Sequence, residues 1–222
     1  ADDPAGQFVL LEMARDMAVR GDDPKTALAA ADALEATFEV DGLAIKAETV
    51  VRLAGSVTEA EQAKMLLEQT LDLVDTAVAR EAFAQARELV TTAGKIAYKA
   101  RDKALRERID GYRQWIDDLV REHPRYLEAM EKLDASPADP EANLIAGRFL
   151  WFGKGDSEAG IPMLALGTDA GLKTLAIAEL KVSDSIEPRL ELADGWWEHA
   201  AKETGPTRKT TGSSRCSCPG SP

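Results

Sequence analysis

Apolar side chains recur at alternating steps of three and four residues along nearly the whole 222-residue chain, and this spacing constrains the fold most strongly. One such stripe contains Leu28, Ala31, Leu34 and Phe38. Residues at this spacing share one face of a helix, whereas a strand would need strict alternation of apolar and polar residues. The spacing predicts an all-α protein with helices over residues 4–20, 24–38, 42–55, 59–79, 82–101, 103–134, 140–152, 157–166, 170–181 and 185–203.

Several of these predicted helices begin with recognisable capping residues. Asp-Pro pairs occur at residues 3–4, 23–24 and 139–140. An Asp side chain can accept a hydrogen bond from an unpaired N–H of the first turn, and Pro is well tolerated at the first helical position. Thr58 and Glu61 have the spacing of a capping box. Within the longest segment, Pro124 removes a backbone donor, so the helix is expected to kink or restart there.

Short connections between successive helices predict that neighbours lie antiparallel as hairpins. A helix-turn-helix unit of about 34 residues that packs on its neighbours is typical of tetratricopeptide-like repeats. We expect a right-handed array of such hairpins, with an N-terminal subdomain over residues 1–134 and a subdomain of shorter helices over residues 135–205. Residues 206–222 are rich in Thr, Ser, Gly, Pro and Arg and are predicted to be disordered.

Charge and cysteine content argue against several classes of protein. The formal net charge is −12, which disfavours binding to nucleic acid or to an anionic membrane surface. No uncharged stretch approaches the roughly 20 apolar residues needed to span a bilayer, so membrane insertion is not expected. The two cysteines, Cys216 and Cys218, supply too few ligands for a structural zinc site. No metal and no cofactor are therefore predicted.

The sequence also lacks a recognisable catalytic constellation. Its two histidines are His123, which precedes a proline, and His199, which lies near the end of a predicted helix. Neither pairs with a nucleophile in a known pattern, and the carboxylates lie mostly three or four residues from Lys or Arg, as on solvated helix faces. We therefore expect no catalytic residues and a protein that is not an enzyme.

Aromatic residues near the C-terminal end are the most suggestive feature. The candidate partner-binding residues are Arg148, Trp151, Phe152, Trp196 and Trp197. Adjacent aromatic residues point to different sides of a helix, so one member of each adjacent pair is expected to reach the surface. Two interpretations remain open: large core residues at a subdomain joint, or a partner-binding groove with tryptophan anchors. Residues 206–222 contain nothing able to form a covering helix, so some of Leu192, Trp196 and Trp197 are expected to be exposed and either to support self-association through the C-terminal helix or to bind a partner helix.

Two stretches resemble a helical-repeat module. They are residues 2–16 with Gly21-Asp22, and residues 139–150 with Lys154-Gly155-Asp156 and the run from Leu192 to Trp197. Together they resemble a module of large uncharacterised proteins of planctomycete-type bacteria, over about residues 2–203. The resemblance implies a secretory signal upstream and, in some members, a separate attached domain. It also implies a further helix, rich in Arg, Ala and Tyr, after the two tryptophans. Residues 206–222 do not match that helix, as would be the case after a shift of reading frame or the joining of a foreign segment. No catalytic residues follow from it.

The sequence thus favours a non-enzymatic scaffold that binds a protein partner, or another domain of its own precursor, along a concave helical face. One alternative is an accessory segment of a larger multidomain enzyme. Another is a module that binds a small ligand or glycan through the region of Trp151 and Trp197. The chain begins at Ala1 rather than Met, which suggests a processed form or a fragment. The resemblance implies export to the periplasm or cell surface. If the resemblance is set aside, a cytoplasmic location is the alternative.

Overall fold

The computed structural model describes residues 3–181 and 186–200, and these residues form helices and turns without any strand. The prediction of an all-α protein is therefore confirmed, and the observed helices begin and end close to the predicted positions. The chain divides into two compact units, Ala1–Ile116 and Asp117–Pro222, which are described separately.

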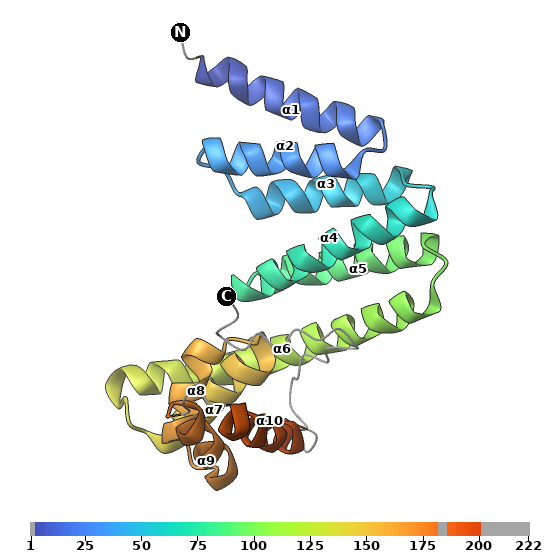
Figure 1. The fold of residues 1–222 in the computed structure, drawn as a ribbon. Helices are drawn as coiled ribbons and strands as arrows, with labels where there is room; N and C mark the ends of the chain where they lie inside the picture. Colours follow the sequence, from blue (N-terminus) through green and yellow to red (C-terminus); the bar gives the residue numbers. More distant parts are fainter. Residues whose placement is uncertain (1–2, 182–185, 201–222) are drawn as a thin grey trace. The chain divides into compact units, whose positions relative to one another are not determined.

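Unit 1 contains five complete helices and the first part of a sixth. They are α1 (Pro4–Arg20), α2 (Pro24–Thr37), α3 (Gly42–Ser56), α4 (Ala60–Ala79), α5 (Phe83–Lys99) and the beginning of α6 (Lys103–Ala135). Figure 1 shows that α1 to α5 follow one another as neighbours, with tight turns at alternating ends. The most extensive contacts join α4 to α5 and α1 to α2, and α3 also contacts both α1 and α5.

The core of unit 1 is made by the apolar stripes of these helices. Its completely buried side chains are mainly leucine, alanine and valine, such as Leu34, Leu53, Leu67 and Leu89. Small alanines between the leucines allow neighbouring helix backbones to approach closely, while burial of each leucine contributes about 1.5–3 kcal/mol. The periodic spacing in the sequence therefore corresponds to the faces that the helices bury.

Lys99 connects two helices of unit 1 through backbone hydrogen bonds. Its Nζ atom, at the end of α5, donates to the carbonyl oxygens of Ala54, Gly55 and Val57 at 2.8, 2.9 and 2.9 Å. The last carbonyls of an α-helix have no intrahelical partner, and the helix dipole makes that end negative. One ammonium group thus satisfies the C-terminal end of α3 and attaches α5 to it.

Unit 2 contains the second part of α6, followed by shorter helices. These are α7 (Pro140–Arg148), a π-helical segment η1 (Phe149–Lys154), α8 (Ser157–Leu166), α9 (Ala170–Glu179) and α10 (Ile186–Ala200). Consecutive members of this series contact one another, α7 with α8, α8 with α9 and α9 with α10. The predicted subdomain boundary, after residue 134, coincides with the end of α6, whereas the compact units divide within that helix.

The capping predictions have mixed outcomes. Asp3, Asp23 and Asp139 each accept a hydrogen bond from the backbone N–H three residues later, at 3.0, 3.1 and 2.9 Å, as predicted. The predicted capping box at Thr58 is wrong, because α4 begins one residue later, with Glu59 as its N-cap, and no side chain caps it. The predicted tail over residues 206–222 lies outside the described residues.

Of the two outcomes expected at Pro124, a kink or a restart, the restart does not occur, since α6 continues through it as one 33-residue helix. Pro124 cannot donate to the carbonyl of Val120, so one intrahelical hydrogen bond is missing there. Packing around that turn compensates. The ring of Tyr126 stacks on that of Phe149 with the centroids 4.4 Å apart, and the centroids of the His123 and Phe149 rings are 5.8 Å apart. These contacts hold the second half of α6 against η1.

Candidate functional site

The candidate site is built on the connection between α7 and α8. The helix that begins at Pro140 widens at Phe149 into the π-helical turn η1, which ends at Gly155 in the left-handed conformation (φ = 76°). A residue with a Cβ rarely adopts this conformation, so glycine permits the sharp turn into α8. Asp156 then caps α8 by accepting from the N–H of Ala159 at 3.0 Å. Short π-helical turns of this kind often occur at functional sites.

Two glycines allow α7 and α8 to approach closely. A Cβ atom on Gly160 would lie 2.8 Å from both the Cβ and the backbone N of Trp151, and 3.1 Å from the carbonyl oxygen of Gly147. A Cβ on Gly147 would likewise lie 2.9 Å from Leu164. Real Cβ contacts are longer than this, so both positions require glycine. This contact fixes the position of Trp151.

Three aromatic side chains from this turn and from α10 form one cluster. The ring centroids of Trp151 and Trp196 are 5.4 Å apart, and Phe152 lies 6.3 Å from each of them. The indole N–H of Trp196 donates to Glu179 Oε2 at 2.9 Å, so this half-buried donor is satisfied. The cluster packs on the buried residues Ile161, Leu164, Leu172 and Ala176.

The expectation that one residue of each adjacent aromatic pair reaches the surface is wrong for Trp151 and Phe152. Both are half-buried and both contact Trp196. Hydrogen bonds from i to i+5 put more residues in each turn, so consecutive side chains diverge by a smaller angle than in an α-helix. The expectation is confirmed for the other pair, because Trp196 packs inward while Trp197 is 79 % exposed.

The solvent side of α10 carries an apolar pair beside acidic residues. Leu190 and Trp197 are 63 % and 79 % exposed and lie seven residues apart, two turns along the same face. Glu191, Asp194 and Glu198 are exposed on the same helix. Leu192 faces the opposite direction and is buried. Of the three residues among which exposure was expected, Leu192, Trp196 and Trp197, only Trp197 is exposed. The exposed face of α10 is thus apolar in the middle and negative along one side.

The remaining sequence candidates do not assemble into a reactive centre. Arg148 is the last residue of α7 and is half-buried. The His199 ring stacks on Phe152 with centroids 6.5 Å apart, and His123 lies beside Tyr126. In the described part of the chain, no three His, Cys, Asp or Glu side chains gather as metal ligands would.

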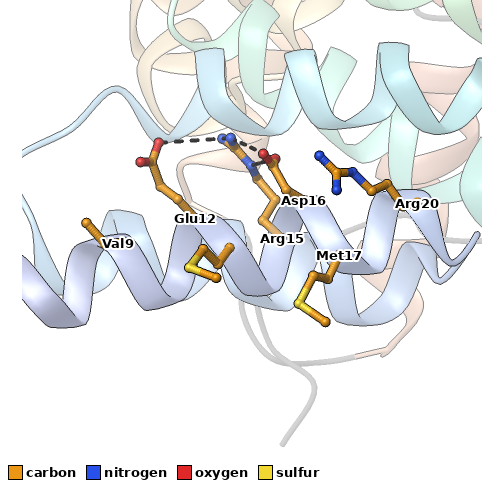
Figure 2. A pocket seen from close by; sticks show the side chains of 7 residues that line it. Val9, Glu12, Arg15, Asp16, Met17 and Arg20 are labelled. Carbon is orange, nitrogen blue, oxygen red and sulfur yellow. Dashed lines mark hydrogen bonds and ion pairs between the residues drawn. The ribbon is translucent and has the colours of Figure 1, made fainter.

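Sequence reasoning did not identify a second exposed apolar surface, on α1. Val9, Leu10, Met13 and Met17 are 52–67 % exposed. A hollow of about 320 Å³, open to solvent, lies along α1, and Figure 2 shows its charged lining, with Glu12 and Asp16 on either side of Arg15. The signal was present in the sequence, since apolar residues in this helix outnumber those that one buried face needs.

The charged row on α1 is joined to α3. Arg15 is 7 % exposed, and its guanidinium lies 3.1 Å from Asp16 Oδ1, which Arg52 of α3 also contacts at 2.7 Å. The hydrogen bond from Arg52 is the main cause of the lowered pKa of Asp16. Burial of the carboxylate raises this pKa, and the hydrogen bond from Arg15 lowers it further. These pairs orient α1 about its axis, with its charged row toward α3.

Comparisons with known proteins add no identification. No protein family, no curated protein sequence and no solved structure matches this chain. Among the helices that the structure describes, none has the length and apolar character required to cross a membrane.

Proposed function

We propose that this protein is a non-enzymatic scaffold of tetratricopeptide-like helical hairpins that binds a protein partner, or another domain of its own precursor. The observation that carries the proposal is the outer face of α10. Trp197 is 79 % exposed there, on a helix whose other side packs into the aromatic cluster through Trp196. Tryptophan is one of the residues enriched at the energetic centre of protein interfaces.

The order of helix contacts supports a repeat of the tetratricopeptide kind. In such arrays the first helix of one hairpin packs against the first helix of the next, as well as against its own partner. In unit 1, α1 contacts α3 and α3 contacts α5, in addition to the contacts within pairs. Close packing at glycines, as between Gly147 and Gly160, is consistent with hairpins whose paired helices approach through small residues. The resemblance to the planctomycete-type module agrees with this proposal.

The partner is a segment that is apolar on one face and basic on its edge. Leu190 and Trp197 provide the apolar contact, and Glu191, Asp194 and Glu198 would repel an acidic segment. An amphipathic helix with lysine or arginine beside its apolar stripe fits this surface. A small-ligand or glycan site is less well supported, because the hollows on α1 and between α6 and α7 are open and neither is lined by tryptophan.

Binding of designed peptides tests this proposal. A fluorescently labelled helical peptide with leucine on one face and lysine on the other is titrated with the full chain, and polarisation gives the Kd. Trp197→Ala should weaken binding at least about tenfold, as expected for loss of an interface anchor. The matched control is Tyr98→Ala, which removes another exposed aromatic residue, 73 % exposed on α5 in unit 1, and should leave the Kd unchanged.

A peptide with glutamate in place of lysine should bind much more weakly. If Trp197→Ala binds the lysine peptide as well as the unaltered chain does, the exposed face of α10 is not the binding surface. If neither peptide binds, the proposed partner chemistry is wrong.

A further inference from the structure

Helix α1 has apolar residues on two sides, and its buried side also carries Arg15. One face packs against α2 and α3 and includes Ala18 and Val19, which are 8 % and 6 % exposed. The opposite face carries Leu10, Met13 and Met17 at 67 %, 53 % and 66 % exposure. A helix that is apolar on both sides is normally covered on both sides. This surface is on another helix and in another unit from Trp197.

The residues on the outer face follow the spacing of a coiled-coil seam. They are Asp3, Gly6, Leu10, Met13, Met17 and Arg20, with steps of three, four, three, four and three. This alternation places Gly6, Leu10, Met13, Met17 and Arg20 on one stripe of the helix, and Asp3, its N-cap, precedes that stripe. Gly6 is half-buried, and each of the other five is exposed. Unbranched methionine side chains adapt well to the surface of another helix.

The order of residues along this seam is self-complementary. When two copies of α1 lie antiparallel about the midpoint between residues 11 and 12, Leu10 of each copy is level with Met13 of the other. Met17 is then level with Gly6, beside which the carboxylate of Asp3 lies. Asp3, at the acidic end of each seam, is level with Arg20 at the basic end of the other. An isologous contact needs this kind of correspondence, in which residue i meets j and j meets i.

The local charge balance also favours a second copy at this surface. The whole chain has a net charge of −12, which opposes the approach of two molecules at most faces. The segment from Asp3 to Arg20 carries three acids, Asp3, Glu12 and Asp16, and two bases, Arg15 and Arg20, so its net charge is −1. Arg52 of α3 also contacts Asp16 at 2.7 Å. The apolar seam thus carries little of the chain's net negative charge.

We propose that two copies of this protein associate through their α1 helices, which pair antiparallel along the stripe from Asp3 to Arg20. A single helix of 17 residues from each copy makes an interface at the small end of the range for specific complexes. Association is accordingly weak, with a dimer Kd on the order of 10–100 μM.

Sedimentation equilibrium of the full chain over a concentration series tests the proposal. A monomer–dimer equilibrium is expected, and Met13→Asp should raise the dimer Kd at least about tenfold by placing a carboxylate at the centre of the seam. The matched control is Met65→Asp, the same substitution at an exposed residue of α4 (46 % exposed), which should leave the Kd unchanged. Circular dichroism establishes that both variants keep their helical content.

Arg20→Glu should raise the Kd about three- to tenfold, whereas Arg20→Lys should preserve it.

Cross-linking then tests the orientation. In a Cys216→Ser, Cys218→Ser background, equal amounts of a Leu10→Cys chain and a Met13→Cys chain are mixed and oxidised. The mixed 10–13 disulfide should exceed the 10–10 and 13–13 products, because antiparallel pairing brings residue 10 level with residue 13. A chain that remains monomeric up to ~1 mM overturns the proposal. The proposal is also overturned if Trp197→Asp abolishes the dimer and Met13→Asp does not, because the contact between copies would then lie on α10.

Discussion

At the scale of single residues, glycine decides how closely α7 and α8 can pack. The backbone at Gly160 lies against Trp151 so closely that a Cβ would be 2.8 Å from that residue's Cβ. The sequence shows that Gly160 is small and near the start of a helix. It does not show that Trp151, nine residues earlier, lies against it, because the intervening π-helical turn sets the position of that side chain.

Gly160→Ala should destabilise the protein by about 1–3 kcal/mol, because the added methyl group must displace Trp151 or the α7 backbone. The control is Gly111→Ala in α6, where a Cβ would meet nothing within 4 Å. That substitution should instead stabilise the helix by about 0.5–1 kcal/mol. Urea unfolding gives both values. Equal and small effects at the two positions would show that α7 and α8 are not in close contact.

At the scale of helices, ion pairs join elements that the sequence places far apart. Glu35 of α2 accepts from Lys46 of α3 at 2.7 Å and lies 3.3 Å from Arg80, the C-cap residue of α4. The side chain of Glu35 is 31 % exposed, so solvent screens these pairs only in part. The hydrogen bond from Lys46 is the main cause of the lowered pKa of Glu35. Burial of the carboxylate raises this pKa, and the hydrogen bond from Arg80 lowers it further.

This lowered pKa predicts an acid-dependent loss of stability. The pKa of Glu35 is lower in the folded protein than the usual value of about 4.3, so the unfolded chain binds the proton more tightly. The stabilisation is complete above the unfolded pKa and is lost as pH falls through the folded pKa. Glu35→Gln should therefore lower the free energy of unfolding at pH 7 and have a smaller effect near pH 3. Thermal unfolding at several pH values measures this difference, and a constant difference would contradict the prediction.

At the scale of the whole molecule, stability is expected to come from apolar packing without a bound metal. The described part of the chain contains no group of three or more candidate ligands, and both cysteines lie outside it. A structural metal normally contributes much of the folding energy of its domain, so its removal is easily detected. EDTA should therefore leave the melting temperature unchanged. A decrease of several degrees that zinc or calcium reverses would show that a site exists.

The all-α class, the approximate helix bounds and the caps at Asp3, Asp23 and Asp139 could be predicted from the sequence, whereas the caps at Asp41, Asp156 and Asp169 were not predicted. These features depend on neighbours three or four residues apart, so the printed order of residues contains them. It also predicted that one of Trp196 and Trp197 would be exposed, because adjacent residues of an α-helix face different directions. The wrong predictions, at Thr58 and at the pair Trp151–Phe152, concern local geometry that departs from the regular α-helix.

Which faces of the helices remain uncovered could not be predicted from the sequence, because this depends on tertiary packing. The outer stripe of α1 has the same composition as a core stripe, so the sequence cannot distinguish Leu10, 67 % exposed, from Leu34, which is completely buried. Burial depends on which helix packs next to which, and that arises from contacts between residues far apart in the chain. The same holds for the hydrogen bond from Trp196 to Glu179 and for the contact of Lys99 with the end of α3. Periodicity specifies a helix and its apolar faces, whereas packing determines which of those faces is left for a partner.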